Sequence, residues 1–130
     1  MPSVLPASPI RVLLVDDAAD IRVLLKLVLE FDDEFVVVAE AANGEEAIRL
    51  SAEHQPDLVV LDIAMPVMDG MDALQQLRLV APKTKVVMYS AYDSGWLAER
   101  ARGFGAAAYL DKTAGVVDMV GQLRSICQPA

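Results

Sequence analysis

The sequence predicts an α/β fold in which five parallel strands form a doubly wound sheet with helices on both faces. Short apolar runs alternate five times along the chain with longer segments whose apolar residues recur at helical spacing. This alternation is typical of βαβ units, and right-handed crossovers between such units favour the doubly wound sheet. The strand-like runs are continuously apolar, which is expected of strands that are covered on both faces.

The first part of the chain supplies three predicted strands and two predicted helices. The strands are expected at Ile10–Val15, Phe35–Ala39 and Leu58–Leu61. The first helix has a polar stripe of Arg22, Lys26 and Glu30 beside an apolar stripe that consists of Ile21, Leu24, Leu25 and Val28. Asn43 is expected to cap the second helix, because an asparagine side chain accepts hydrogen bonds from the first helical turn.

The second part adds two strands and three helices. The strands are expected at Lys85–Tyr89 and Ala107–Leu110. Asp69 and Gly70 form the turn before the third helix, and the segment "YDSGW" opens the fourth. The inner stripe of the last helix consists of Val116, Val120, Leu123 and Cys127. Residues 1–9 hold three prolines and two serines and predict a disordered lead-in, which leaves residues 10–127 as one domain.

The composition excludes several classes of function. The formal net charge is −8, so the domain is not expected to bind nucleic acid through its own surface, because phosphates require clustered Lys and Arg. Cys127 is the only cysteine and cannot form an internal disulfide. Neither a signal peptide nor an apolar run long enough to cross a bilayer is evident. We therefore expect a cytoplasmic protein that attracts cations and basic partners and does not bind membranes.

Acidic residues end two of the predicted strands. The run "RVLLVDD" closes the first strand with Asp16 and Asp17, and "DLVVLD" closes the third with Asp62. Ser90 ends the fourth strand, and Lys112 follows the fifth. Because ligands bind beyond the carboxyl ends of the strands in such a sheet, these five residues are expected to share one pocket.

The expected pocket suits a divalent cation and phosphate chemistry. Two carboxylates about 4 Å apart repel by roughly 4 kcal/mol at an effective dielectric of about 20, so a group of three needs a proton or a cation. A site of oxygen ligands with few protein contacts favours Mg²⁺. The carboxylate left over can attack phosphorus and form an aspartyl phosphate, whose oxygens Ser90 and Lys112 could hold.

Four segments resemble the receiver domain of the response regulators of bacterial two-component signalling. They are "VLLVDD", "PDLVVLDIAMPVMDG", "VVMYSA" and "AAYLDK", and they occur in the family's order with family-like separations. The resemblance extends from about Ile10 to Ile126. It implies a flavodoxin-like strand order, 2-1-3-4-5, and a phosphorylation-switched signalling protein instead of an enzyme. Both a stand-alone receiver and the receiver part of a longer regulator fit this pattern.

The resemblance also implies roles for individual residues, with Mg²⁺ as the cofactor. The implied site consists of the phosphoacceptor Asp62, the metal ligands Asp16 (largely through water), Asp17, Asp62 and Ala64 (through its carbonyl), the switch residues Ser90 and Tyr109, and the phosphate-binding Lys112. The implied phosphodonor is a phosphohistidine on a sensor histidine kinase. The implied output is a partner protein or domain, or a second copy of the chain, reached through the face of the fourth helix, fifth strand and fifth helix.

Two positions depart from the family's pattern, and one other function stays open. Thr113 follows the lysine where many receivers have a proline in a cis bond, and Ala64 stands where many relatives carry a polar side chain. The alternative function is a Mg²⁺-dependent phosphohydrolase with an aspartyl-phosphate intermediate. Such enzymes usually carry a second acid two residues after the nucleophile, which is the position of Ala64. Trp96 fits either a partly buried core position or a partner surface.

Overall fold

The computed structural model describes residues 9–31, 33–65, 67–90, 95–112 and 115–127. The predicted lead-in, apart from Pro9, and the bond between Lys112 and Thr113 lie outside these residues. In the described part of the chain, none of the helices has both the length and the apolar character that crossing a bilayer requires.

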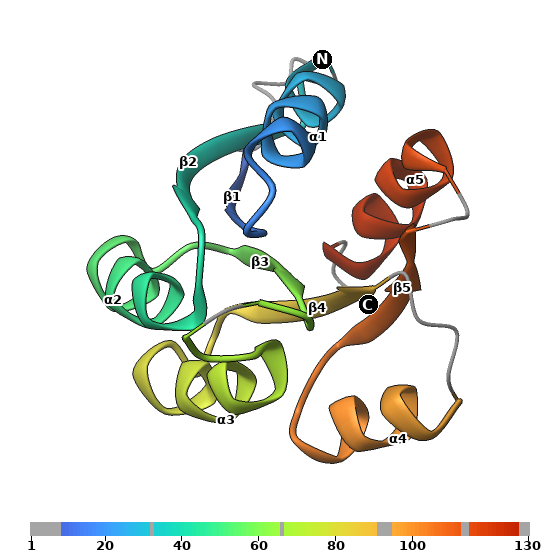
Figure 1. Ribbon diagram of the computed structural model, residues 1–130. Coiled ribbons are helices and arrows are strands. Elements are labelled where there is room, and N and C mark those ends of the chain that lie inside the picture. The colour runs from blue at the N-terminus through green and yellow to red at the C-terminus, as the bar shows by residue number, and fades with distance from the viewer. Residues whose placement is uncertain (1–8, 32, 66, 91–94, 113–114, 128–130) are drawn as a thin grey trace.

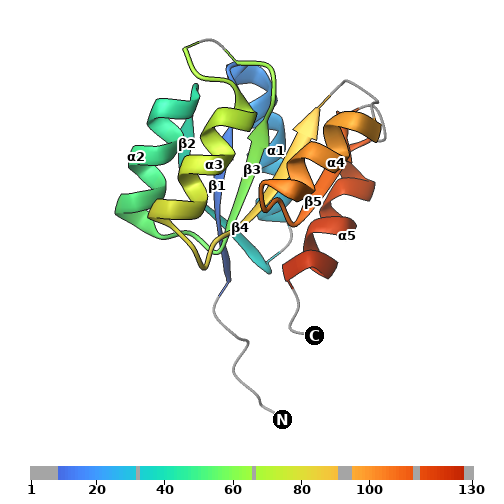
Figure 2. The same cartoon turned by 90° about the horizontal axis from the view of Figure 1, so that it is seen from below.

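The described strands form one parallel sheet in the order β2-β1-β3-β4-β5, so the predicted fold and strand order are confirmed (Figure 1). The arrowheads of β3 and β4 point to the same edge of the sheet (Figure 2). The strands are β1 (Ile10–Val15), β2 (Phe35–Ala41), β3 (Leu58–Asp62), β4 (Lys85–Ser90) and β5 (Ala108–Asp111). The last four differ from the predicted ranges by one or two residues at one or both ends, and β3 and β4 include the polar residue that ends each strand.

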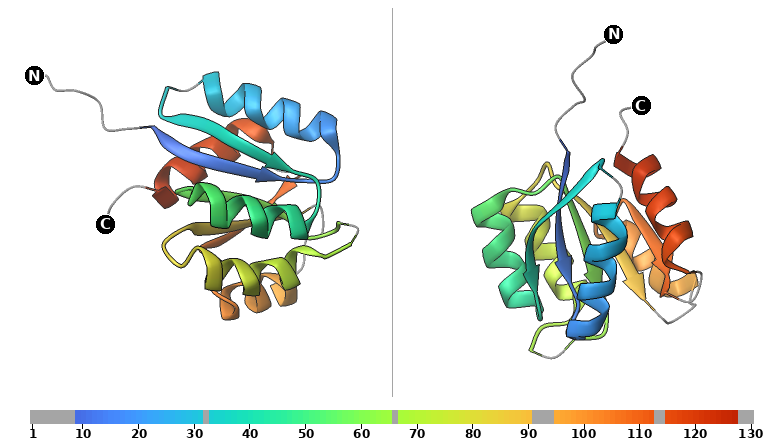
Figure 3. Two further views of the ribbon diagram at one scale, coloured as in Figure 1. Left: turned by 90° about the vertical axis from the view of Figure 1, so that its left-hand side faces the viewer. Right: turned by 90° about the horizontal axis from the view of Figure 1, so that it is seen from above.

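Helices cover both faces of the sheet, as predicted. Helices α1 and α5 lie on one face, and α2, α3 and α4 lie on the other (Figures 1 and 3). The helices are α1 (Ala19–Phe31), α2 (Gly44–His54), α3 (Gly70–Val80), α4 (Gly95–Gly103) and α5 (Val116–Cys127). Each face has its own apolar core: residues such as Leu14, Leu25 and Leu123 pack on the α1/α5 face, and Leu61 and Leu74 pack on the opposite face.

Two helix starts follow from polar side chains in the sequence. Asn43 Oδ1 accepts a hydrogen bond from the backbone N–H of Glu46 at 3.0 Å, which confirms it as the cap of α2. Asp69 Oδ1 accepts from the N–H of Asp72 at 3.0 Å and caps α3 in the same way. These caps fix where the chain turns from the edge of the sheet back along its face.

The predicted apolar stripe of α1 is partly wrong. Leu25 and Leu29 are the fully buried residues of this helix, whereas Leu24 is 44% exposed. The outward side of α1 carries an apolar stripe that consists of Val23, Leu24, Leu27 and Phe31. Trp96, for which two positions were open, is 64% exposed on α4, and the guanidinium carbon of Arg100 lies 5.1 Å from its ring centroid. Cys127 is half-buried at the edge of the core.

Candidate functional site

The pocket forms where the carboxyl ends of β1, β3 and β5 meet. Asp16 follows β1, Asp62 is the last residue of β3, and Lys112 follows β5. In each of these strands, the alternate residues that precede the site residue belong to the core of the α1/α5 face. The two acids and the lysine therefore leave the sheet on the same side, and the structure brings them together as predicted.

Three carboxylates converge in this pocket. Asp16, Asp17 and Asp62 each offer one oxygen, and these oxygens all lie within 4.8 Å of one another. Asp16 and Asp62 are buried, with 1% and 4% of their surface exposed, whereas Asp17 is exposed. Such a set of hard oxygen donors, open to solvent at one member, fits a divalent cation that retains water ligands.

Lys112 joins the two buried acids. Its Nζ donates a hydrogen bond to Oδ2 of Asp16 at 3.0 Å and lies 3.3 Å from Oδ1 of Asp62. Burial by itself would lower the pKa of Lys112, but the hydrogen bond to Asp16 and the charges of both acids raise this pKa overall. The ammonium is therefore positively charged at neutral pH and counters part of the acidic charge.

The pocket changes the pKa of the Asp62 carboxyl. Its burial, together with the negative charge of Asp16, raises the pKa of the Asp62 carboxyl. Lys112 and a hydrogen bond from the backbone of Ala64 oppose this change without cancelling it. The surrounding protein thus stabilises the ionised Asp62 carboxylate poorly. A bound cation, or a covalent modification of the carboxylate, would reduce this unfavourable energy.

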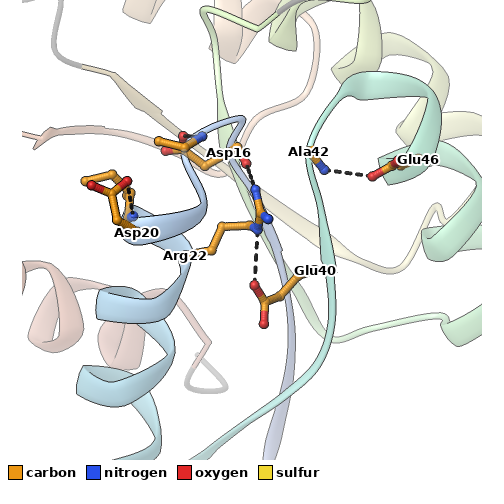
Figure 4. A network of polar contacts seen from close by, with 8 residues as sticks. Asp16, Asp20, Arg22, Glu40, Ala42 and Glu46 are labelled. Atoms are coloured by element: carbon orange, nitrogen blue, oxygen red, sulfur yellow. Dashed lines mark hydrogen bonds and ion pairs between the residues drawn. The ribbon is translucent and has the colours of Figure 1, made fainter.

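Backbone contacts hold Asp16 in place. Its Oδ1 accepts a hydrogen bond from the N–H of Ala18 at 2.9 Å, which closes the turn into α1. Arg22 of α1 donates from Nη1 to the carbonyl oxygen of Asp16, and its Nε lies 3.1 Å from Glu40 on β2 (Figure 4). Arg22 therefore ties the β1–α1 corner to the neighbouring strand.

The loop after Asp62 requires a glycine and holds an unusual valine. A Cβ added to Gly70 would lie 2.3 Å from the carbonyl oxygen of Asp62, so only glycine permits this close approach of α3 to β3. The N–H of Gly70 also donates to the carbonyl of Ile63 at 2.8 Å. Val67 has φ of 71° and is 72% exposed, a backbone conformation that β-branched residues rarely adopt.

The other predicted site residues come from β4, from β5 and from the loop after β3. Ser90 is buried at the end of β4. It lies two and four residues after Met88 and Val86, which pack on the α2–α4 face, so Ser90 faces the same side of the sheet. Tyr109 of β5 packs, partly buried, against the same core. Ala64 is exposed beside Asp62. Ser90 and Tyr109 therefore share one face of the sheet, opposite to the face from which Asp16, Asp62 and Lys112 emerge.

Sequence reasoning missed Tyr89, which takes part in the pocket. Its side chain is buried, and Nζ of Lys112 lies 4.6 Å from the centroid of its ring. Strand alternation could have found it, because Tyr89 precedes Ser90 and must point to the face that carries the acids. Arg22 was assigned only to a polar stripe, and no sequence signal identified its contact with the backbone of Asp16.

Comparison with known protein families identifies the domain. The family model described as the response regulator receiver domain matches residues 12–124. The chain belongs to this family. Receiver domains of this kind serve in two-component signalling, and the predicted family resemblance is confirmed.

Individual relatives of this receiver domain occur in proteins of different lengths. The chain is 41% identical over 117 residues to a protein-glutamate methylesterase/protein-glutamine glutaminase of Rhodospirillum centenum, covering 88% of this chain and 30% of that protein. It is 40% identical over 116 residues to the transcriptional regulatory protein PdtaR of Mycobacterium tuberculosis, covering 88% of this chain and 55% of that protein. The chain therefore spans only about a third to a half of these relatives.

A solved structure of a receiver superimposes closely. The complex of CheX, CheY, BeF₃ and Mg²⁺ from Borrelia burgdorferi contains a chain that matches with a TM-score of 0.87 and 28% identity, covering 93% of this receiver and 91% of that chain. The likeness extends over nearly the whole sheet and its helices.

Proposed function

We propose that this receiver is switched by phosphorylation of Asp62, with the phosphoryl group supplied by a phosphohistidine of a sensor histidine kinase. The observation that carries the proposal is the position of Lys112, 3.0 Å from Asp16 and 3.3 Å from Asp62 in one pocket. Lys112 is a positive charge beside a buried carboxylate, and conversion of Asp62 to an acyl phosphate would raise the negative charge of this side chain from one to about two.

Three side chains of this receiver take part in the transfer of the phosphoryl group from the kinase histidine. An oxygen of Asp62 attacks phosphorus, the bond between phosphorus and the histidine nitrogen breaks, and its electron pair stays on the imidazole, which then takes up a proton. Lys112 holds an oxygen of the transferring group, and Ser90 holds another after moving towards it. The product is an acyl phosphate on Asp62 and a neutral histidine on the kinase.

The acid cluster fits Mg²⁺ as the cofactor. Asp16, Asp17 and Asp62 would hold it, with the carbonyl of Ala64 as a further ligand, because the carboxylate oxygens converge within 4.8 Å and one of the three acids is open to solvent. When bound, Mg²⁺ neutralises charge that develops on the phosphoryl oxygens. The CheY complex from Borrelia burgdorferi includes both BeF₃ and Mg²⁺, which supports this assignment.

The outward stripe of α1 is the surface we assign to the kinase. Its residues Val23, Leu24, Leu27 and Phe31 are 55%, 44%, 66% and 93% exposed, and contiguous exposed apolar side chains indicate a protein-binding surface. Helix α1 begins two residues after Asp17, so a partner docked along it reaches the pocket. Residues 10–127 act in this proposal as one signalling domain of a cytoplasmic regulator, not as an enzyme.

Phosphorylation changes the face formed by α4, β5 and α5, which contacts an output protein or domain or a second copy of the chain. Ser90 and Tyr109 support this assignment, because both lie on the sheet face covered by α4. The exposed Trp96 on α4 gives the face an aromatic contact residue. Direct binding of nucleic acid by this domain is not part of the proposal, since its net charge is −8.

The direct test is labelling of the acceptor. Incubation with a small phosphodonor and Mg²⁺, followed by mass spectrometry of peptides, is expected to find one phosphoryl group on Asp62. The variant Asp62→Asn should take up none, whereas Glu99→Gln, which removes a negative charge from an exposed position on α4, should label as the parent does. Equal labelling of the Asp62→Asn variant would contradict the assignment. Steady turnover of a small phosphoester would instead support the phosphohydrolase alternative.

A further inference from the structure

Tyr89 occupies a position between the phosphoacceptor strand and the lysine strand. It pairs in register with Asp62 on β3 and with Leu110 on β5. Its side chain packs with the core of the α1/α5 face and is only 5% exposed. The ring therefore stands beside Lys112, on the same side of the sheet as the acids.

Among the described residues, three groups lie next to the ammonium of Lys112. Oδ2 of Asp16 is 3.0 Å away, Oδ1 of Asp62 is 3.3 Å away, and the centroid of the Tyr89 ring is 4.6 Å away. The face of an aromatic ring attracts a cation at this separation, and the attraction is stronger where water is largely excluded. The side chain of Lys112 is 22% exposed, so the contact is partly screened from solvent.

The ring differs from the two acids in one chemical respect. Asp62 loses its carboxylate charge when it becomes an acyl phosphate, and the charge of Asp16 is shared with any cation in the pocket. The quadrupole of the Tyr89 ring stays the same through every one of these states. The ring also stays uncharged at neutral pH, because a phenol ordinarily has a pKa near 10.0 and burial raises the pKa of Tyr89 further.

We propose that Tyr89 is a positioning residue whose ring holds the Lys112 ammonium at the phosphoacceptor before, during and after phosphoryl transfer. This inference rests on the proposed function, because it assumes that Lys112 acts on the phosphoryl group. The aromatic ring of Tyr89, and not its phenolic hydroxyl, positions the ammonium. Phenylalanine in place of Tyr89 should therefore preserve the position of the Lys112 ammonium, and an aliphatic side chain should not.

The kinetic test compares Tyr89→Phe with Tyr89→Leu. The rate of Asp62 labelling by a small phosphodonor with Mg²⁺ is expected to stay near the parental value in the Phe variant. In the Leu variant it should fall by about two- to thirty-fold, the range that a cation–π contact of this kind corresponds to. Tyr89→Met is a second non-aromatic variant, and thermal unfolding identifies variants that fail to fold.

A double-mutant cycle separates positioning from packing. In a Lys112→Ala background the ring has no ammonium to hold, so Tyr89→Leu and Tyr89→Phe should label at the same rate. If Tyr89→Leu slows labelling by the same factor with and without Lys112, then Tyr89 only fills the core and the proposal is wrong.

Proton NMR gives a readout that needs no phosphoryl transfer. The ε-methylene protons of Lys112 should be shifted upfield by the ring current in the parent and in Tyr89→Phe, and this shift should disappear in Tyr89→Leu. An unchanged shift in the Leu variant would overturn the proposal. If the shift follows the ring but the parent takes up no phosphoryl group, then the contact exists and the proposed function fails instead.

Discussion

Nζ of Lys112 lies 3.3 Å from Oδ1 of Asp62, whose side chain is only 5% exposed. The lysine is also hydrogen-bonded to Asp16, so one positive charge is shared between two buried acids. The pKa of Asp62 is raised despite a cation at contact distance, because burial and the charge of Asp16 outweigh the attraction of Lys112. The ionised Asp62 carboxylate therefore destabilises the folded state, and the size of this effect depends on pH.

The substitution Asp62→Asn should stabilise the fold at neutral pH in buffer without divalent cations. A raised pKa means that the folded state binds the Asp62 proton more tightly than the unfolded state, so the parent loses stability as pH rises above the unfolded value near 3.8. The variant is free of this loss, because an amide side chain does not titrate. Thermal unfolding from pH 3 to 8 should show a higher Tm for the Asp62→Asn variant near pH 7 and little difference near pH 3.

The control for this experiment is Glu99→Gln, which removes one negative charge from the exposed surface of α4. Its Tm difference from the parent should vary much less with pH. A stabilisation of Asp62→Asn that is the same at pH 3 and pH 8 would show that the cause is not the ionisation of Asp62.

Removal of Asp17 should abolish most of the stabilisation that Mg²⁺ provides. A ligand that binds only the folded state stabilises it by about 1.4 kcal/mol at ten times its Kd, and Asp17 is the solvent-exposed member of the acid cluster. Thermal unfolding with and without millimolar Mg²⁺ should give a smaller Tm increase for Asp17→Asn than for the parent. Glu53→Gln, near the end of α2, should respond as the parent does; an equal response of all three proteins would remove Asp17 from the metal site.

The sheet and the convergence of the acids were predictable because they follow from local patterns. The strands are continuous apolar runs, and Asp16, Asp62 and Lys112 each lie at the end of one, so parallel topology is sufficient to bring them together. Strand alternation places Tyr89 on the face that carries the acids, but its contact with Lys112 was not predictable in the same way. This contact depends on the rotamer that Lys112, after β5, adopts next to the neighbouring strand β4. No spacing of residues in the sequence encodes that rotamer.

The buried face of α1 was ambiguous for a physical reason. Apolar residues occur nearly all around this helix, so helical periodicity alone does not distinguish the face that packs from the face that remains exposed. The sheet decides the outcome, since Leu25 and Leu29 meet β1 and β3 residues in the core. Leu24 and Leu27 remain outside and are available to a partner.

The substitution Val67→Asn should stabilise the protein. Val67 has φ of 71°, and the left-handed region costs roughly 1–2 kcal/mol for a residue with a Cβ, whereas asparagine visits it routinely. Urea denaturation should give a gain of about 1 kcal/mol for Val67→Asn. The matched control is Val67→Thr, which is also polar but keeps the β-branch and should gain little. Equal gains in both variants would mean that the benefit comes from removing an exposed apolar side chain.

The substitution Leu27→Arg should impair phosphorylation by the kinase without affecting the pocket. Leu27 is 66% exposed in the α1 stripe, and Leu79 on α3 is 81% exposed and away from it, so Leu79→Arg is a matched control. Loss of roughly 1 kcal/mol of binding energy should slow kinase-dependent labelling of Leu27→Arg about fivefold. Labelling by a small phosphodonor should be unchanged in both variants. Impairment of both variants in the kinase assay would assign no special role to α1.

Tyr109 should transmit phosphorylation to the face formed by α4, β5 and α5. It packs on the α2–α4 side of the sheet, the side to which Ser90 also belongs, and Tyr109 pairs with Met88, two residues before Ser90. A phosphoryl group that draws Ser90 towards Asp62 changes the space next to Tyr109, which can then rotate. The two states need differ by only about 1–3 kcal/mol in partner affinity for effective switching.

Amide NMR with and without a beryllofluoride mimic of the phosphoryl group measures this response. Shift changes are expected in the described residues of α4, β5 and α5, 95–112 and 115–127, as well as around Asp62. In Tyr109→Ala the changes near Asp62 should remain, because the pocket is intact, while those in α4 and α5 should shrink. Partner affinity should then depend less on the mimic. Changes confined to the residues around Asp62 and Ser90 in the parent would show that the signal leaves the pocket by another route, and that Tyr109 is a core residue only.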